Sequence, residues 1–476
     1  MIKFKYNFLI PFVFFLLTAN LAISQSEKPN IVYIVADDLG YGDLSSYGQT
    51  KFETPNIDAL AEKGIKFTQH YSGSTVCAPS RSALITGLHT GHTTVRGNLE
   101  IQPEGQYPLP DSVYTLAEML KEAGYTTGAF GKWGLGPVGS EGDPNNQGFD
   151  IFYGYNCQRL SHSYYPYHLW NNNQKVILEG NEGINKGQYA PDLIHAQAID
   201  FIEENKDKPF FLFYPTPLPH AELVAPREYM DKFEAKFAPD KPYNGVDSGP
   251  RYRTGGYASQ PKTRAAFAAM ITVLDDEVGQ IVAKLEELGL ADNTLIIFTS
   301  DNGPHKEGGA DPDFFNSNGP LKGYKRDFYE GGIRVPMIAR WDGKIKPGSQ
   351  TDHISAFWDM MPTLNEVTGL NKSIHTDGVS FVNALKGKPQ QEHEFLYWEF
   401  PVHGGKQAVR MGDWKGIRLD AHSGLDSPIE LYNLKNDLGE TTNVAAEFPV
   451  IADSIADIMR NQHVASPLFP FNFEKK

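Results

Sequence analysis

Short apolar runs alternate with amphipathic segments along most of the chain, and this alternation predicts an α/β fold. Nearly continuous apolar runs are typical of strands that are buried on both faces of a sheet. They occur at residues 30–36, 65–70, 126–130, 209–214, 294–299 and 335–340. Apolar positions with helical spacing lie between them, at residues 54–63, 112–123, 196–204 and 264–288. We therefore predict a large mixed, mostly parallel sheet sandwiched by helices, with ligands beyond the carboxyl ends of its strands.

The pattern changes near residue 385. Shorter strand-like runs follow at residues 394–399, 407–410, 414–418 and 429–432, separated by turn residues such as Gly412 and Asp413. A helical segment follows at residues 449–461. This pattern predicts a smaller C-terminal antiparallel α+β subdomain over residues 386–476, after a larger domain over residues 25–385.

The first 24 residues have the pattern of a signal peptide. Lys3 and Lys5 precede an apolar run at residues 8–17, and a small-residue cleavage site ends at Ser24. The run is too short to cross a membrane, and no cysteine follows the cleavage site to carry a lipid. We therefore expect an exported protein, periplasmic or secreted after cleavage near Ser24, without a membrane anchor.

Charge and cysteine content narrow the classes of function. The 476 residues include 43 Lys and Arg against 58 Asp and Glu, which gives a net charge of −15. Without an excess of positive charge, the protein is a poor candidate for binding nucleic acid. The two cysteines, Cys77 and Cys157, could form a disulfide in an exported protein. The sequence around Cys77 favours a different role.

Acidic and amide side chains follow two of the predicted strands. Asp37 and Asp38 end the first strand, and Asp301 and Asn302 follow the strand at residues 294–299. Carboxylate and amide oxygens together suit a hard cation such as calcium or magnesium. Either pair alone would more often be a turn or a helix cap. Two such pairs at the ends of two parallel strands favour a metal site.

A second motif surrounds Cys77. Pro79 fits the first turn of a helix that would end at Gly87, so Cys77 would lie just before a helix N-terminus, where anions are favoured. Arg81 follows on the same face, one turn later. This arrangement suits a nucleophile that attacks an anionic ester. As an unmodified thiol, Cys77 could also be a nucleophile of low pKa.

Cys-x-Pro-Ser-Arg, followed by Ser-Ala-Leu-Ile-Thr-Gly, resembles the signature of type I sulfatases. In that family the cysteine is oxidised to formylglycine by a maturation enzyme, which is thus an implied partner. The resemblance covers nearly the whole mature chain and implies an alkaline-phosphatase-like fold with its catalytic domain at residues 25–385. Further matches are the two acidic pairs and the segments around Lys132, His220, Lys325 and residues 430–434.

The resemblance also implies roles for these residues. One calcium ion per chain would be held by Asp37, Asp38, Cys77, Asp301 and Asn302. A hydroxyl of the hydrated aldehyde at residue 77 would attack sulfur, and the second hydroxyl would help to expel sulfate. Arg81, Lys132 and Lys325 would offset negative charge, and His220 would protonate the leaving oxygen.

One position departs from the family pattern. The family commonly has Gly-Lys-Trp-His-Leu-Gly, and this chain has Gly134 in place of that histidine, which contacts the nucleophile. His305 and His162 are candidates for supplying the missing contact. His162 and Arg159 also belong to an aromatic segment at residues 153–170 that could stack on sugar rings or could equally be a packed surface loop.

The resemblance thus implies a sulfuric ester hydrolase that acts on a sulfated carbohydrate, such as a polysaccharide or its oligosaccharides. Two alternatives stay open at this point. One is a phosphate or phosphonate ester hydrolase of the same superfamily, which often has a second metal site with extra His and Asp ligands. The other is a noncatalytic protein that binds sulfated glycans.

Overall fold

The computed structural model describes residues 1–2 and 28–475. The predicted signal peptide therefore lies outside the described residues, apart from Met1 and Ile2. In the described part of the chain, an 11-stranded sheet has the order β10-β2-β9-β8-β1-β7-β3-β4-β5-β6, with β11 paired to β2. Its strands are β1 (Asn30–Ala36), β2 (Ile65–Tyr71), β3 (Thr126–Lys132), β4 (Ile151–Tyr155), β5 (His168–Asn171), β6 (Gln174–Ile177), β7 (Phe210–Pro215), β8 (Thr294–Ser300), β9 (Arg334–Arg340), β10 (Ser349–Thr351) and β11 (Ser355–Ala356).

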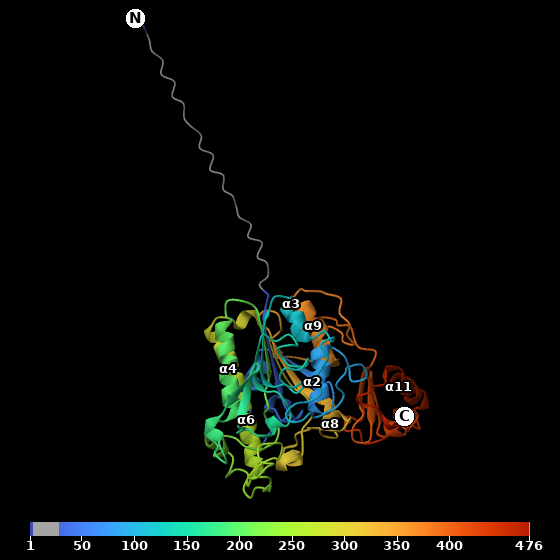
Figure 1. Ribbon diagram of the computed structural model, residues 1–476. Coiled ribbons are helices and arrows are strands. Elements are labelled where there is room, and N and C mark those ends of the chain that lie inside the picture. Colours follow the sequence, from blue (N-terminus) through green and yellow to red (C-terminus); the bar gives the residue numbers. More distant parts are fainter. Residues whose placement is uncertain (3–27, 476) are drawn as a thin grey trace.

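Helices cover both faces of this sheet (Figure 1). One face carries α1 (Pro55–Glu62), α4 (Ala190–Glu204) and α6 (Thr263–Glu287), and the other carries α2 (Cys77–Thr86), α3 (Leu116–Glu122) and α9 (Met360–Val367). Strand β1 serves both cores, since Val32 and Ile34 pack toward the first set of helices and Ile31 and Tyr33 toward the second. Shorter helices are α5 (Arg227–Met230), α7 (Pro312–Phe315), α8 (Glu330–Ile333) and α10 (Val382–Leu385).

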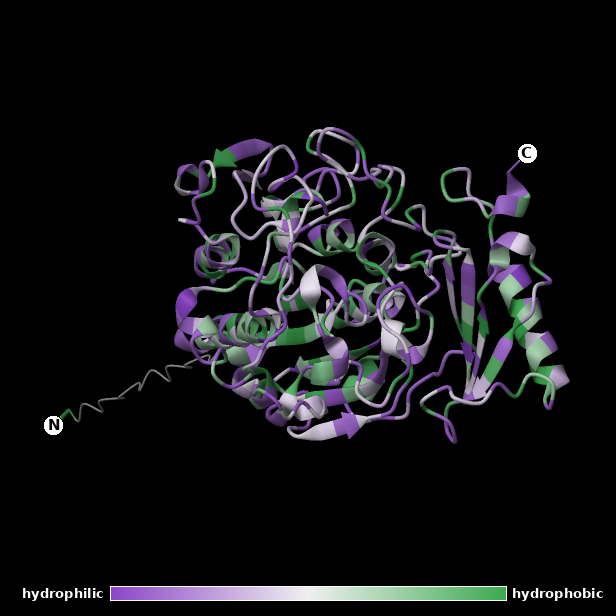
Figure 2. Cartoon of the chain, turned by 90° about the horizontal axis from the view of Figure 1, so that it is seen from below, coloured by the Kyte–Doolittle hydropathy of each residue, from purple (hydrophilic) through white to green (hydrophobic). Residues whose placement is uncertain are grey.

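The sheet is mostly parallel, as predicted. The central strands β8, β1, β7, β3 and β4 are parallel to one another. Strand β9 runs antiparallel to both β2 and β8, and β5 and β6 extend the other edge as antiparallel strands. The fully buried strands appear as apolar ribbons in the middle of the large domain in Figure 2.

A separate antiparallel sheet lies beside the large domain (Figure 2). In the described chain it contains the 4 strands β12 (Leu396–Phe400), β13 (Lys406–Met411), β14 (Trp414–Arg418) and β15 (Glu430–Asn433), and α11 (Pro449–Gln462) packs on it. This architecture confirms the predicted small C-terminal α+β unit. The boundary at residue 385 stays a prediction.

A buried charge cluster joins this sheet to the large domain. Lys415 Nζ lies 2.8 Å from Glu330 Oε1 and 3.8 Å from Glu440 Oε1, and all three side chains are fully buried. The Glu330 backbone N–H donates to Glu440 Oε2 (2.7 Å). Lys322 Nζ donates to the Glu440 carbonyl oxygen (2.9 Å). The segment at residues 322–330 is therefore held in place by side chains of the C-terminal unit.

Some predicted elements have different bounds in the structure. Helix α3 begins at Leu116 instead of residue 112, because Thr115 and Glu118 form a capping box that starts the helix there. Helix α4 begins at Ala190, with Pro191 in its first turn, six residues before the predicted start. The segment at residues 153–170, which could be either a sugar-stacking rim or a packed surface loop, instead contributes its two ends to β4 and β5.

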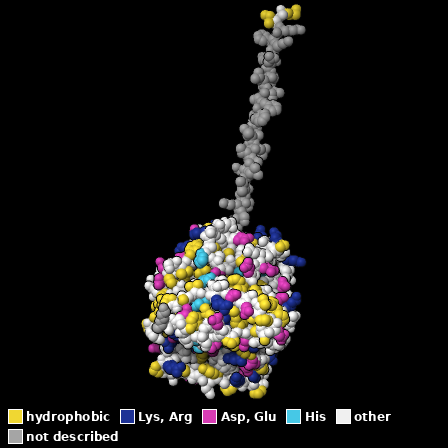
Figure 3. All heavy atoms as spheres, turned by 90° about the vertical axis from the view of Figure 1, so that its right-hand side faces the viewer, with side chains coloured by type: hydrophobic (Ala, Val, Ile, Leu, Met, Phe, Trp, Pro, Cys, Tyr) yellow, Lys and Arg dark blue, Asp and Glu magenta, His cyan; other side chains and the backbone are white. Residues whose placement is uncertain are grey.

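The surface agrees with the composition. Acidic and basic side chains are interspersed with apolar ones on the face shown in Figure 3. None of the helices in residues 28–475 combines the length and apolar character that crossing a membrane requires.

Candidate active site

Two acidic pairs meet at the ends of the adjacent strands β1 and β8. Ala36 is in register with Ser300, so Asp37 and Asp301 leave the sheet side by side. Asp38 has a left-handed backbone (φ 65°), and this turn brings both Asp37 and Asp38 into the same pocket. The Asp38 N–H donates to Asp301 Oδ1 (3.1 Å), and Asn302 Nδ2 donates to Asp38 Oδ1 (2.6 Å). All four side chains are fully buried.

Cys77 faces this acidic group. It is the first residue of α2, whose left-handed C-cap is Gly87, so the helix starts two residues earlier than Pro79 suggested. Cys77 Sγ lies 3.3 Å from Asp37 Oδ1 and 3.9 Å from Asp38 Oδ1. Cys77 and Cys157 are both free thiols, so a disulfide between them is not formed.

Lys132 and Arg81 form ion pairs with the carboxylates on the side of the site where Cys77 lies. Lys132 ends β3 and places its Nζ 2.5 Å from Asp37 Oδ2 and 3.5 Å from Cys77 Sγ. Arg81 lies one turn after Cys77, and its Nη2 lies 2.9 Å from Asp301 Oδ2 and 3.5 Å from Asp37 Oδ2. The prediction that Arg81 faces the same site as Cys77 is confirmed.

Lys325 and His220 both lie close to the carboxylate of Asp38. Lys325 Nζ lies 2.7 Å from Asp38 Oδ2. His220 Nε2 lies 3.4 Å from the same oxygen, while its Nδ1–H donates to the Ala221 carbonyl oxygen (2.5 Å). Burial, together with the charge of Lys325, lowers the pKa of His220 to about 3. The imidazole is therefore neutral at pH 7 in this structure, with its unprotonated Nε2 directed toward Asp38.

The carboxylates form a site that fits a hard cation. Burial raises the pKa of Asp37 and of Asp38, but the surrounding cations outweigh burial and hold both values below the ordinary range. Burial and the nearby charge of Asp37 raise the pKa of Asp301 to about 6. Asn302 Oδ1 is buried and has no hydrogen-bond partner in the described part of the chain. An acceptor without a donor, beside crowded carboxylates, is what a cation-binding site requires.

The structure contradicts one interpretation of Cys77. Burial, together with the charges of Asp301 and Asp37, raises the pKa of its thiol well above the ordinary value. A reactive cysteine needs an environment that stabilises the thiolate, whereas here burial and the two carboxylates outweigh Lys132 and Lys325. The prediction of an unmodified thiol nucleophile of low pKa is therefore wrong.

The predicted substrate-binding residues separate into two sets. His162 and His305 both stack on His220, with ring centroids 5.3 Å and 5.6 Å away. Arg159 points elsewhere: its Nε donates to the Thr254 carbonyl oxygen (2.6 Å), and its Nη1 lies 3.5 Å from Glu100. Arg159 lines a cavity of about 300 Å³ together with His168 and Arg253, and neither His220 nor Cys77 lines it.

The aromatic segment is mainly a packing element. Tyr153 and Tyr155 belong to β4, and Tyr164 is fully buried in the same core. The prediction that this segment could present stacked aromatic rings to a sugar is therefore wrong for these three residues. Tyrosine is found both in surface loops and in buried strands, so the sequence alone does not distinguish between them here.

A second group of possible metal ligands lies outside this site. His89, His92 and Asp377 place their ligand atoms within 4.8 Å of one another. However, His89 Nδ1 accepts a hydrogen bond from the Gly91 N–H (3.1 Å), so its Nε2 carries the proton, and it donates to Gln462 Oε1 (3.1 Å). A metal-binding histidine instead donates from its other nitrogen. We therefore interpret this group as a structural hydrogen-bond cluster.

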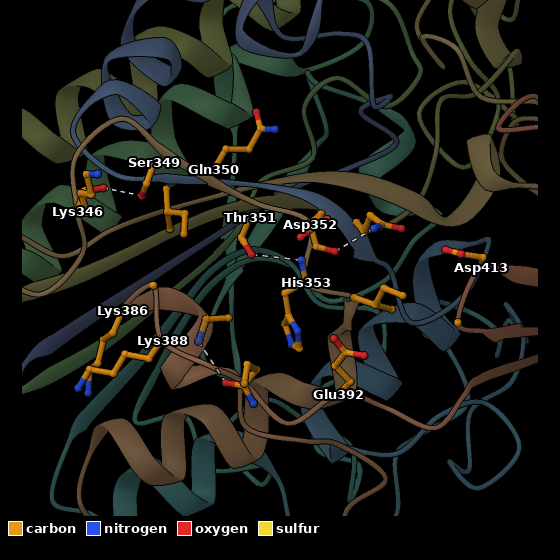
Figure 4. Close-up of a pocket in the computed structure, with 17 residues that line it drawn as sticks. Lys346, Ser349, Gln350, Thr351, Asp352, His353, Lys386, Lys388, Glu392 and Asp413 are labelled. Atoms are coloured by element: carbon orange, nitrogen blue, oxygen red, sulfur yellow. Dashed lines mark hydrogen bonds between the residues drawn. The ribbon is translucent and has the colours of Figure 1, made fainter. Parts of the chain in front are cut away.

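A larger cavity also lies away from the catalytic candidates. Its volume is about 600 Å³, and it opens beside β10 and the loop at residues 386–392. Figure 4 shows Lys386 and Lys388 at one end and Glu392 and Asp413 toward the other. None of the predicted site residues in the described chain lines this cavity, so its size does not indicate the reaction site.

Sequence reasoning missed Glu307. Its Oε2 lies 3.3 Å from Lys325 Nζ and 3.7 Å from His220 Nε2, and its Oε1 pairs with Arg326. Burial raises its pKa, but the charges of Lys325 and Arg326 outweigh that effect and hold it below the ordinary value. A single glutamate between a lysine and two glycines gives no signal in the sequence. Its position six residues after Asp301 was the only clue.

Comparisons with known proteins agree with this geometry. A sulfatase family model matches residues 29–370, and a model of the C-terminal part of N-sulphoglucosamine sulphohydrolase matches residues 323–463. The chain is 30% identical to an N-acetylgalactosamine-6-O-sulfatase of Bacteroides thetaiotaomicron, over 92% of this chain and 93% of that protein. It is 32% identical to arylsulfatase A of Homo sapiens, over 90% and 85%.

A solved structure gives the same result. The crystal structure of Ps i-CgsB is 29% identical and superposes with a TM-score of 0.77, covering 92% of this chain and 94% of that chain. A further structure of Ps i-CgsB is a complex with k-i-k-neocarrahexaose. These matches favour a sulfatase over a phosphate or phosphonate hydrolase and over a noncatalytic binding protein. The chain therefore belongs to the sulfatase family, whose members are sulfuric ester hydrolases.

Proposed function

We propose that this sulfatase is exported and removes sulfate from a sulfated carbohydrate, a polysaccharide or its oligosaccharides. The observation that carries the mechanism is the position of Cys77, whose Sγ lies between Asp37 Oδ1 (3.3 Å) and Lys132 Nζ (3.5 Å) at the end of β1. Converted to formylglycine by a maturation enzyme, residue 77 would supply the nucleophilic hydroxyl that a thiol of raised pKa cannot supply.

A cation would complete the acidic pocket. Asp37, Asp38, Asp301 and Asn302 offer only oxygen ligands, which suits one calcium ion per chain, with residue 77 beside it. Such an ion would supply Lewis-acid polarisation of a sulfate oxygen. Asn302 Oδ1 is a suitable ligand because no described residue donates a hydrogen bond to it.

The cationic side chains bind and orient the anionic sulfate group. Lys132 and Arg81 lie on the residue-77 side and offset negative charge there, and Lys325 approaches from the His220 side. All three are at least nine-tenths buried, so their charges act with little screening by solvent. The sulfate would therefore bind between two sets of fixed positive charges.

His220 is the candidate proton donor to the leaving alcohol oxygen. Its Nε2 must carry the proton to act in this way, yet this nitrogen is unprotonated at pH 7 in the structure. A bound sulfate ester places a negative charge beside the ring and raises the pKa of His220. Glu307 Oε2 lies 3.7 Å from His220 Nε2, and its negative charge also favours the protonated imidazole. Proton donation is thus linked to substrate binding.

The substrate class rests on the relatives. The protein of Bacteroides thetaiotaomicron is an N-acetylgalactosamine-6-O-sulfatase, and a crystal structure of Ps i-CgsB is a complex with k-i-k-neocarrahexaose. A carbohydrate substrate also fits the predicted export of the chain, since Lys3, Lys5 and the apolar run at residues 8–17 form a signal-peptide pattern. His162 and His305 line the pocket beside His220 and are the candidate contacts to the sugar.

One experiment tests both the nucleophile and the reaction. The protein is made with and without a formylglycine-generating enzyme, and the tryptic peptide that ends at Arg81 is weighed. We expect the mass at residue 77 to fall by about 18 Da, as replacement of CH2–SH by CHO requires. Sulfate release from sulfated oligosaccharides should rise with the converted fraction, and Cys77→Ser should release no more than one sulfate per chain. Full turnover by unconverted protein or by Cys77→Ser would contradict the mechanism.

A further inference from the structure

Gln158 carries a buried amide that the fold leaves without partners. Its backbone N–H donates to Gln106 Oε1 (2.7 Å), and its carbonyl oxygen accepts from Ser161 Oγ (2.8 Å). By contrast, its side-chain Oε1 and Nε2 contact no donor or acceptor in residues 28–475, although the residue is only 4% exposed. Burying an amide without hydrogen bonds costs folding free energy, so such groups call for an explanation.

The amide occupies the side-chain space of residue 134. A Cβ atom placed on Gly134 would lie 2.1 Å from Gln158 Nε2, so any side chain there would require the Gln158 amide to move. The two segments continue side by side after β3 and β4, because the Trp133 N–H donates to the Tyr155 carbonyl oxygen (2.9 Å) and the Gly134 N–H to that of Asn156 (3.2 Å). Side chains alternate at the end of β3, with Ala129 and Trp133 in one core and Phe130 in the other, so residue 134 faces the same way as Lys132, whose Nζ contacts Asp37 and Cys77.

The segment that carries Gln158 borders the catalytic pocket. His162, four residues later, stacks on His220 with an interplanar angle of 12°. Arg159, which lies between them, points outward to Thr254 and Glu100. His162 Nδ1 lies 3.1 Å from the carbonyl oxygen of Gly255, next to Thr254. Other buried side-chain amide atoms in residues 28–475 also lack a partner, among them Gln106 Nε2, Gln147 Oε1, Asn156 Oδ1 and Asn302 Oδ1, of which the last belongs to the proposed cation site.

We propose that the Gln158 side-chain amide binds the sulfate group of the substrate, with Nε2–H donating to a sulfate oxygen on the Lys132 side of the pocket. This inference rests on the proposed function, because it takes the anionic ester as the ligand. It makes Gln158 a substrate-binding residue supplied by a different strand end from Lys132. The amide is neutral at every working pH, so it adds a hydrogen bond without adding a titrating group at this position.

Binding of inorganic sulfate tests the proposal without turnover. The full chain is titrated with sodium sulfate by calorimetry, and its melting temperature is measured without sulfate. A lost hydrogen bond to an anion should weaken binding about 10-fold or more in Gln158→Ala. Gln147→Ala is the matched control, since that buried glutamine donates to the carbonyl oxygens of Leu109 and Glu141, and its sulfate affinity should equal that of the unaltered protein.

A second variant covers the case in which Gln158→Ala does not fold. Gln158→Glu keeps the shape of the side chain but can carry a negative charge. Its sulfate affinity relative to the unaltered protein should fall further as pH rises from 5 to 8, because the carboxyl group ionises and repels the anion. A purely structural amide would give a constant ratio across this range.

The outcomes separate this inference from the proposed function. Sulfate binding by the unaltered protein with unchanged affinity in Gln158→Ala, or with a constant ratio in Gln158→Glu, overturns the role of Gln158 alone. An unaltered protein that neither binds sulfate nor releases it from any sulfate ester overturns the proposed function as well. Weakened binding by both variants, with the Gln147→Ala control unaffected, supports the inference.

Discussion

Replacing Lys415 by methionine should destabilise the protein strongly, although Lys415 lies far from the nucleophile along the chain. Its ammonium group is fully buried and lies 2.8 Å from Glu330 Oε1 and 3.8 Å from Glu440 Oε1. Removing one partner of a buried ion pair typically costs about 3–5 kcal/mol, because the remaining charge is left uncompensated. Glu330 would keep Arg334, at 3.2 Å, whereas Glu440 Oε1 has no hydrogen-bond partner in the described chain. At pH 6 Glu440 is largely protonated, so the loss there comes mainly from Glu330, and ionisation of Glu440 adds to it toward pH 8.

The pKa of Glu440 predicts how the destabilisation caused by Lys415→Met changes with pH. Burial raises the pKa of Glu440 to about 8, against an ordinary value of 4.5. A carboxyl group with a raised native pKa stabilises the fold at low pH, and that contribution is lost as pH rises from about 4.5 toward 8. Removing Lys415 takes away the charge that lowers this pKa, so Lys415→Met should be more destabilised at pH 8 than at pH 6. Adding Glu440→Gln should remove the extra loss at pH 8 and leave the loss at pH 6 largely unchanged.

Urea unfolding at pH 6 and pH 8 measures these differences. Lys63→Met is the control, since Lys63 forms an exposed pair with Glu286 and should cost less than about 1 kcal/mol. Because the segment at residues 322–330 carries Lys325, kcat/KM on an aryl sulfate should also fall in Lys415→Met. A loss of stability no larger than that of Lys63→Met, or a loss equal at the two pH values, would refute this account of the cluster.

Three further predictions follow from the site and the core. His220→Ala should lose about 100-fold more rate on a sulfated sugar than on nitrophenyl sulfate, because only the sugar alcohol needs a proton to leave; equal losses would remove His220 from the acid role. Chelation should abolish activity and lower the melting temperature, and calcium should restore both better than zinc, since the ligands are oxygens; full activity after exhaustive chelation would contradict the metal site. Burial lowers the pKa of His70 to about 3, so on acidification below about pH 6.5 its proton uptake on unfolding should cost about 1.4 kcal/mol per pH unit. Urea unfolding of His70→Asn at pH 7.5, 6 and 5 should show its stability deficit shrinking as pH falls, and a constant deficit would show that His70 does not titrate as the structure indicates.

The central part of the fold could be predicted because each central strand is buried on both faces. Strands β1, β7 and β8 are continuous apolar runs, and the ends of β1 and β8 carry the acidic pairs that the structure brings together. The direction of β9 could not be predicted in this way, since an apolar run has the same pattern in either direction. Strand β4 was missed because it contains two tyrosines and a glycine, residues that are equally common in loops.

The catalytic residues were predictable where a motif fixes their spacing. Cys77 and Arg81 lie within one helix, so their proximity follows from helical geometry alone. Glu307 and Gln158 depend on how separate loops pack above the sheet, and a single glutamate or glutamine has no pattern of its own. The space beside Gly134 is filled by the Gln158 amide, and the sequence does not show that these two segments are neighbours.

The position of β1 has a consequence for the order of events during synthesis. This strand lies in the middle of the sheet, and its two neighbours begin only at Phe210 and Thr294. Until both have left the ribosome, α2 has no surface to pack on, and Cys77 stays accessible. In the finished fold every residue of α2 is buried and Cys77 is 1% exposed. An enzyme that oxidises this cysteine must therefore act on the nascent or unfolded chain, so a maturation enzyme added to the purified, folded protein should find no substrate.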